Sequence, residues 1–507
     1  MSELDSTDNA EFSPAEVGDG EGDRPGGLRR AASTSPLAVR VQQPAPPSTD
    51  PDEDTRWLWY LFASCMVLAV FALGVALYGL TRTDRKAHGF WRPLQAPAAQ
   101  PTPAEGPAPR EPTFEPPPYE DVTVTKEFVP LAANKRVPVV CTVSNAFGAD
   151  GVLPADGVCD ALFYDSLYRD DRNKLPGPYD GGLERFLDLG RAMQYTGFGV
   201  SFDVLMDVRN FDVTSPSFTS GIVELWNRGV SHFGALRVYG TGNGEDDVIK
   251  FLYFLQAVEK KIQETMTDSR PYYTVIGVSY HPDASYEKVI QHMKKVFKPF
   301  IYVVVIHVPY LDKELPTCLI LPPTLLENPA EATSSNQPSV MEAMRHVERM
   351  RGHELHLPVT ISFTLRARIY RPASVRSTSF YEPFQKCRDY SGDSDVSPAS
   401  VCKGQYGSNF NYFKDGESAF AFDTQQELTI TYDTDITIRT KVCRAKLAYP
   451  NVPFGIAAFD INLDVADSAC YSLQIEAGNF TRLKVLSSLN DYISGYHWNF
   501  DQCMNSI

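Results

Sequence analysis

The sequence predicts an α/β protein: a (β/α)8 TIM barrel with a small α+β insertion between its seventh and eighth strands, preceded by one transmembrane helix. Three features of the 507-residue chain lead to this prediction. An uncharged apolar run lies early in the chain, eight shorter apolar runs follow, and amphipathic segments separate these eight runs. Apolar runs that alternate with helices are typical of βαβ units and of a parallel sheet buried on both faces.

The first 56 residues contain almost no aliphatic or aromatic side chains and are rich in Ser, Pro, Gly, Asp and Glu. Such a segment cannot bury enough apolar surface to offset the chain entropy that folding removes. We therefore expect residues 1–56 to form a disordered cytoplasmic tail.

Residues 57–80 form the uncharged run, WLWYLFASCMVLAVFALGVALYGL, which is longer than the roughly 20 residues needed to cross a bilayer. Trp57 and Tyr78 stand near its ends, where interfacial aromatic residues are favoured, and Arg56 and Arg82 bracket it. The run follows 56 polar residues, whereas a cleaved signal peptide would begin near the first residue. The pattern predicts a single transmembrane helix that acts as a signal anchor.

Two features disagree about which side of the membrane the large C-terminal region occupies. Arg82, Arg85, Lys86 and Arg92 outnumber the basic residues just before the run, which favours a cytoplasmic C-terminal side. The cysteines favour the opposite side, because one of nine lies in the run and the others follow it as an even set without a CxxC pair, which indicates disulfides. These eight are Cys141, Cys159, Cys318, Cys387, Cys402, Cys443, Cys470 and Cys503. The N-glycosylation sequence NFT, which begins at Asn479, lies in the same region. We expect a single-pass type II membrane protein with its C-terminal domain extracellular or lumenal.

Residues 81–135 are predicted to form a Pro-rich stalk, because Pro alternates with Ala and Glu over 93–120 and favours an extended polyproline-type chain. The sequence PPPY at 116–119 matches ligands of WW domains, although a piece of stalk is the simpler interpretation.

The net charge of −16 argues against a nucleic-acid partner, which would need a basic face. The sequence carries no metal, haem or nucleotide signature, so we expect no cofactor.

The remaining region, 136–507, is predicted to be the barrel domain. Its eight apolar runs are 137–143, 158–164, 197–206, 232–239, 273–280, 300–308, 359–365 and 454–461. The amphipathic segments between them include 183–195, 246–266, 286–297 and 339–350. Eight strands with intervening helices over about 370 residues fit a (β/α)8 barrel. The gap between the seventh and eighth runs is too long for one loop and one helix, which predicts an inserted subdomain of short strands at about 371–440.

Several segments of this region share a distinctive order of residues. The first two apolar runs contain CTVSNAF from Cys141 and CDALFY from Cys159, similar to C-Y-Y-x-N-W and C-T-H-I-I-Y. Tyr432-Asp433 and then GIAAFDINLD from Gly455 follow the pattern Y-D, helix, G-V-M-V-W-x-x-D-x-D. Through these segments the chain resembles glycoside hydrolase family 18, the chitinases and chitinase-like lectins, from roughly residue 136 to residue 470. The resemblance implies a TIM barrel and a disulfide between Cys141 and Cys159, whose closure of a loop of ~18 residues contributes about 3 kcal/mol.

The fourth apolar run departs from that family at the residues that perform its chemistry. The family carries D-G-x-D-x-D-x-E there. Its final Glu protonates the glycosidic oxygen, and the preceding Asp positions the acetamido group of the substrate. When Gly234 is aligned with the Gly of this motif, the four acidic positions hold Phe233, Leu236, Val238 and Gly240. A glycine cannot donate a proton, so the resemblance implies a catalytically degenerate relative.

Other residues at the barrel mouth are candidates for lining a groove. Active sites in TIM barrels lie at the carboxyl ends of the strands. There we expect Asp203, Tyr239, His307, Phe459 and Asp460. Phe459 stands where the family has a Trp that stacks on a sugar, and His307 stands where it has the Asp of M-x-Y-D. With no partner at ligand spacing, His307 also suits a hydrogen-bonded structural role. Further carboxylates near the mouth that could act as relocated acids are Asp207, Asp312, Glu314 and residues 245–247, the last of which also suit a helix N-terminus.

Two hypotheses about function follow. In the first, the protein is a non-catalytic chitinase-like membrane protein that binds a chitin-like glycan or a protein partner through the loop face of its barrel. In the second, it is an active glycoside hydrolase that acts on N-acetylglucosamine polymers with relocated acidic residues. The fold alone does not decide between them.

Overall fold

The structure is a computed structural model that describes the C-terminal domain. The described residues are 136–203, 212–238, 244–279, 286–307, 318–329, 337–388, 395–402, 405–495 and 498–505. The predicted tail (1–56), transmembrane helix (57–80) and stalk (81–135) lie outside them. Within the described ranges, no helix combines the length and apolar character needed to cross a bilayer.

Eight parallel strands close into a barrel, as the sequence predicts. Around the ring the order is β1, β13, β7, β6, β5, β4, β3, β2. The strands are β1 (Val140–Val143), β2 (Ala161–Leu167), β3 (Gly197–Phe202), β4 (Val230–Val238), β5 (Thr274–Ser279), β6 (Ile301–Val305), β7 (Val359–Thr364) and β13 (Gly455–Phe459). Each predicted apolar run overlaps one of these strands, so the (β/α)8 fold is confirmed.

Helices with recognisable starting residues follow the strands. The side chain of Asp180 accepts a hydrogen bond from the backbone N–H of Leu183 at the start of α2, and Ser215 caps α3 directly before a Pro. Ser339 and Glu342 form a reciprocal capping box at the start of α6. The helices are α2 (Gly181–Gly190), α3 (Pro216–Asn227), α4 (Gly244–Thr265), α5 (Glu287–Lys295), α6 (Val340–Gly352), α7 (Asp435–Ala448), α8 (Thr481–Ser494) and α9 (Phe500–Asn505). Short 3-10 helices are η1 (Arg169–Asp171), η4 (Thr378–Tyr381), η5 (Pro398–Val401), η6 (Gln405–Ser408), η7 (Ile461–Leu463) and η8 (Tyr471–Leu473).

The strands are apolar on both faces because two separate cores pack against them. An inner core fills the barrel and includes Phe163, Leu236, Val303 and Phe459. A larger outer core lies between the strands and the helices. This double burial explains why the strands appear in the sequence as continuous apolar runs rather than as alternating ones.

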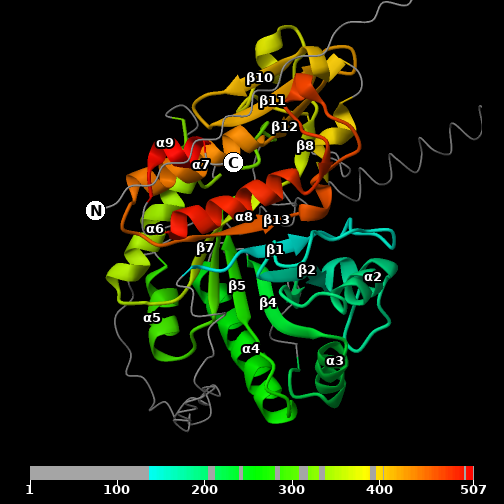
Figure 1. Ribbon diagram of the computed structural model, residues 1–507, viewed down its shortest axis with the longest axis vertical. Coiled ribbons are helices and arrows are strands. Elements are labelled where there is room, and N and C mark those ends of the chain that lie inside the picture. Colours follow the sequence, from blue (N-terminus) through cyan, green and yellow to red (C-terminus); the bar gives the residue numbers. More distant parts are fainter. Residues whose placement is uncertain are drawn as a thin grey trace, which may run out of the picture. The chain divides into compact units, whose positions relative to one another are not determined.

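The predicted insertion is a five-stranded antiparallel sheet. Its order is β10, β11, β12, β8, β9, with bounds β8 (Ala367–Tyr370), β9 (Asp395–Val396), β10 (Phe410–Phe413), β11 (Ser418–Asp423) and β12 (Leu428–Tyr432). The sheet therefore begins at Ala367, before the predicted start at 371, and the end of the predicted range overlaps α7. Lys441 of α7 donates a hydrogen bond to Ser418 of β11 at 3.1 Å. Figure 1 shows this sheet, in yellow to orange, at the end of the domain opposite to α3, α4 and α5.

All eight cysteines that follow the predicted membrane run are paired in the structure. The pairs are Cys141–Cys159, Cys318–Cys387, Cys402–Cys470 and Cys443–Cys503. The first is the pair that the resemblance implied. The second and third hold the inserted sheet to the loops after β6 and β13, and the fourth joins α7 to α9.

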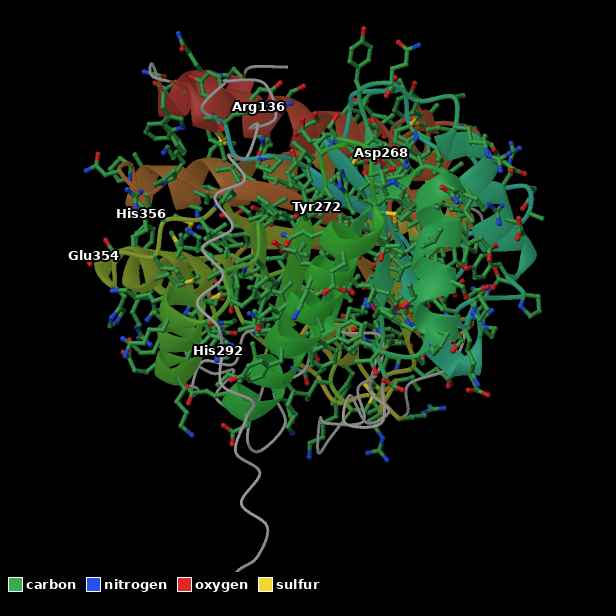
Figure 2. The ribbon with its side chains drawn as sticks, turned by 90° about the horizontal axis from the view of Figure 1, so that it is seen from below. Arg136, Asp268, Tyr272, His292, Glu354 and His356 are labelled. Atoms are coloured by element: carbon green, nitrogen blue, oxygen red, sulfur yellow. A yellow bond between two sulfur atoms is a disulfide. The ribbon has the colours of Figure 1, made fainter. Side chains whose placement is uncertain are left out.

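The chain enters the barrel at the amino ends of the strands, opposite to the mouth. Arg136 forms ion pairs with Asp160 at 2.7 Å and with Asp491 of α8 at 2.6 Å. Figure 2 labels Arg136, Tyr272 and His356, which precede β1, β5 and β7 and mark this end of the barrel.

Candidate functional site

The strand that carries the catalytic motif in family 18 contains an irregularity here. Ala235 pairs with Ile276 of β5, and Val238 pairs with Val278. The chain therefore advances by three residues along β4 while it advances by only two along β5. β4 therefore contains one extra residue, a β-bulge, which changes the face to which the following side chains point. Leu236 lies in the inner core, whereas Phe233 and Val238 lie in the outer core.

Arg237 is the residue that reaches into the barrel mouth from this part of β4. Its Nε lies 2.6 Å from Oδ2 of Asp165 on β2, and its Nη2 lies 3.3 Å from Oδ1 of Asp460 after β13. Neither β2 nor β13 is a neighbour of β4 in the barrel, so the Arg237 side chain must cross the interior to contact both. Both carboxylates are fully buried, and the Arg237 side chain is 5% exposed. Arg237, one residue before Val238, thus points into the mouth, whereas Val238 packs in the outer core.

Two further arginines extend this network toward opposite flanks of the mouth. Arg169 lies 3.0 Å from Asp165 and 3.0 Å from Asp203, one of the predicted groove-lining residues. Arg366 lies 3.9 Å from Asp460 and 3.2 Å from Asp395 on β9 of the inserted sheet. We call Asp165, Arg169, Asp203, Arg237, Arg366, Asp395 and Asp460 the mouth network.

The two central carboxylates have pKa values shifted in opposite directions. Burial disfavours ionisation of Asp165, but the charges of Arg237 and Arg169 outweigh it and lower the pKa of this carboxyl. Burial is the largest effect on Asp460 and raises its pKa to about 7, although Arg237 opposes this shift. The second oxygen of Asp460 accepts a hydrogen bond from Thr364 at 2.5 Å. Asp165 is therefore ionised at neutral pH, while Asp460 binds a proton in that range.

His307 and Phe459 cover each other at the bottom of the mouth. Their ring centroids are 4.5 Å apart, and both side chains are buried. Nδ1 of His307 lies 2.8 Å from the hydroxyl of Ser362, which also accepts a hydrogen bond from the backbone N–H of Ile306. Burial, followed by the charges of Arg366 and Arg237, lowers the pKa of His307 well below its usual value, so the imidazole is neutral. Phe459, which the resemblance places at the sugar-stacking position of family 18, is therefore covered by His307.

The remaining predicted residues lie outside this cluster or outside the described residues. Tyr239, Gly240, Asp207, Asp312 and Glu314 belong to the undescribed ranges, and so the proton-donor position assigned to Gly240 is untested. Residues 245–247 form the first turn of α4. The carboxylate of Glu245 accepts a hydrogen bond from the backbone N–H of Lys288 at the start of α5. This residue thus caps a neighbouring helix, which supports the structural interpretation of the acidic run.

Two network residues that were not predicted have a weak signal in the sequence. Arg237 and Asp165 are charged residues inside otherwise apolar strands, within HFGALRVYG and ALFYDSLYR. A charge in a buried strand is rarely left unpaired, so an Arg on one strand and an Asp on another predict an ion pair in the barrel. Within the described ranges, no three His, Cys, Asp or Glu side chains are grouped so that they could hold a metal ion.

Comparison with solved structures identifies proteins that share this architecture. The structure of YKL-39 solved with chitooligosaccharides matches with a TM-score of 0.50 and 15% identity, over 69% of this chain and 98% of that chain. The structural neighbours of this chain are chitinases and chitinase-like proteins. Human YKL-39, described as a pseudo-chitinase with retained chitooligosaccharide binding, matches at 0.50 and 14% over 69% and 99% of the two chains. Chitinase ChiA74 from Bacillus thuringiensis matches at 0.50 and 10%, over 69% of each chain.

The chitinase-like fold is shown by structure alone. No protein-family model matches the sequence, and no curated protein matches it either. The neighbours include both a protein named as a chitinase and one described as a pseudo-chitinase, so the activity of this chain must be argued from its own mouth residues.

Proposed function

We propose that this protein is a non-catalytic, chitinase-like binding protein, tethered to a membrane, which holds its ligand at the loop face of the barrel. The observation that carries the proposal is Arg237, which joins Asp165 and Asp460 at the centre of the mouth. A guanidinium cannot act as a general acid at neutral pH, and here it pairs with both central carboxylates.

Glycoside hydrolysis needs an acid that reaches the glycosidic oxygen. Asp460 has the pKa of a possible acid, about 7, and this observation favours the second candidate, an active hydrolase with relocated acids. However, Asp460 is fully buried, and its two oxygens contact Arg237 and Thr364. A substrate would have to displace these contacts before it could receive the proton, so we favour the binding role.

A chitin-like glycan is the ligand that we propose. The support is the structural likeness to YKL-39, for which chitooligosaccharide binding is described. Because His307 covers Phe459, we expect the glycan to contact the outer loops of the mouth and not to stack on Phe459. If the glycan does not bind, a protein ligand at the same loop face is the remaining form of the proposal.

The membrane arrangement is also part of the proposal. Residues 57–80 would cross the bilayer once, with the tail (1–56) in the cytoplasm and the stalk (81–135) leading to the barrel. The pairing of eight cysteines in four disulfides supports an oxidising compartment for the domain, either extracellular or lumenal.

Two measurements on the purified full-length chain in detergent test the proposal. We expect no hydrolysis of chitin oligosaccharides or fluorogenic N-acetylglucosaminides above background. Turnover that disappears in Asp460→Asn or Asp203→Asn would instead establish the hydrolase. We also expect saturable binding of chitin oligosaccharides that Phe459→Leu leaves unchanged. A large loss of affinity in this variant would show that the sugar stacks on Phe459, and the absence of any glycan binding would leave only a protein ligand.

A further inference from the structure

Asn479 lies in a hairpin of two short strands, and buried contacts hold the residues next to it. β14 (Val465–Ala466) pairs with β15 (Gly478–Asn479), and Asn479 stands opposite Val465. The next residue, Phe480, is buried, and its backbone N–H donates to the carbonyl of Asp464 at 2.7 Å. Asn479 itself is exposed, as are residues 476–478 before it. The buried neighbour thus fixes the backbone, while the Asn479 amide remains accessible.

Contacts at the start of α8 fix the backbone that follows Asn479. Arg482 is buried and pairs with Asp464 at 2.8 Å. The second carboxylate oxygen of Asp464 accepts from the backbone N–H of Leu483 and so caps α8. Thr481, whose hydroxyl completes the sequence Asn-x-Thr, lies between these buried residues and is partly exposed. Both side chains that N-glycosylation requires are therefore outside the core.

The hairpin belongs to the loop between β13 and α8, at the carboxyl end of a barrel strand and so at the mouth. It also contacts the inserted sheet region, because the hydroxyl of Ser397 donates to the carbonyl of Val465 at 2.7 Å. A group attached to Asn479 would stand at the rim of the mouth, beside the insertion.

We propose that Asn479 carries an N-linked glycan at this rim. In the reaction, the amide nitrogen of Asn479 forms a bond to the anomeric carbon of an oligosaccharide donated by a polyisoprenoid diphosphate. The bond from that carbon to the diphosphate breaks, the diphosphate lipid leaves, and the amide nitrogen loses one proton. The proposal rests on the lumenal placement of the domain in the proposed function, because the donor and its transferase act in the lumen.

The test is the mobility of the full-length chain on denaturing gels after expression in cells with a secretory pathway. We expect treatment with peptide N-glycosidase F to increase the mobility of the wild type. Asn479→Gln and Thr481→Ala should each remove this shift, while Thr481→Ser, which keeps the acceptor hydroxyl, should retain it. An unshifted wild type, or a shift that persists in Asn479→Gln, overturns the proposal.

A second sequon separates a failure at Asn479 from a failure of the membrane topology. Arg376→Asn creates an acceptor sequence with Ser377 and Thr378, all three of which are exposed in the inserted region. If this variant is glycosylated and the wild type is not, the domain is lumenal and only the Asn479 proposal fails. If neither chain is glycosylated and the eight cysteines react with a thiol reagent without reduction, the lumenal placement itself is wrong.

Discussion

Replacing Asp460 by Asn should remove a pH dependence of stability that the wild-type protein shows. The Asp460 carboxyl has an ordinary pKa of 3.8 in the unfolded chain, and burial raises it to about 7 in the folded domain. Between these pH values the folded protein binds one proton more than the unfolded chain, so the free energy of unfolding falls as the pH rises. The full shift corresponds to about 4 kcal/mol, of which about 2–3 kcal/mol is lost between pH 5 and pH 8.

Urea unfolding of the full-length chain in detergent, followed by the fluorescence of buried Trp226, measures this effect at both pH values. We expect Asp460→Asn to resemble the wild type at pH 5 more closely than at pH 8, where it should be the more stable protein. Other titrating groups are common to both chains, so the difference between their profiles isolates Asp460. Parallel profiles for the two proteins would refute the assignment of a proton to Asp460.

Asp165 provides a matched control from the same network. The charges of Arg237 and Arg169 overcome burial and lower its pKa, so its contribution to stability is present above pH 3.8 and is lost only as the pH falls further. Asp165→Asn should therefore be destabilised by about 3–5 kcal/mol at pH 5 and by a similar amount at pH 8. A strong difference between these pH values would show that the charge of Asp165 controls the titration of Asp460, whose pKa it raises.

Three further variants test other contacts of the domain. Arg237→Met leaves two buried carboxylates without their shared partner, so we expect a loss of about 3–5 kcal/mol in urea unfolding and no gain of hydrolysis. A stable or active variant would contradict this. Lys441→Met leaves Asp433 buried without its ammonium partner and should cost about 3–5 kcal/mol, with proteolysis of the inserted sheet at lower urea concentration. Unchanged proteolysis would show that Lys441 does not hold the insertion. The double variant Cys141→Ser, Cys159→Ser should lose about 3 kcal/mol, and an unchanged unfolding midpoint would contradict the chain-entropy estimate.

The barrel was predictable from the sequence because each of its strands is marked by a local pattern of residues. Each strand is buried on both faces, so each appears as a continuous apolar run, and the helices between them show a separate periodicity. The insertion was predictable for a simpler reason, since the gap before the eighth run exceeds one loop and one helix. Its start at Ala367 was missed because β8 follows β7 after only two residues, and the apolar pattern does not mark a boundary there.

The mouth network was not predictable from local pattern. If side chains alternated strictly along β4, Arg237 would point to the outer face of the barrel, where Val238 packs. Only the pairing of Val238 with Val278 reveals the extra residue in β4 that turns Arg237 inward. Nor does the sequence show that Asp165 and Asp460 approach the same guanidinium, because closure of the barrel brings β2 and the end of β13 to β4. The resemblance implied which positions of β4 correspond to the acids of family 18, and Arg237 is not one of them but lies one residue before Val238.

A network of buried ion pairs is an inefficient way to stabilise a barrel, because apolar side chains of similar volume often stabilise as well or better. Its geometry suggests a positioning role. Arg366 joins Asp460 at the end of a barrel strand to Asp395 in the inserted sheet, and Arg169 joins Asp165 to Asp203 on the opposite flank. Arg237 links these two halves through Asp165 and Asp460. We infer that the network holds the insertion and the mouth flanks in one fixed arrangement, so that loops from distant parts of the chain keep constant positions around the mouth.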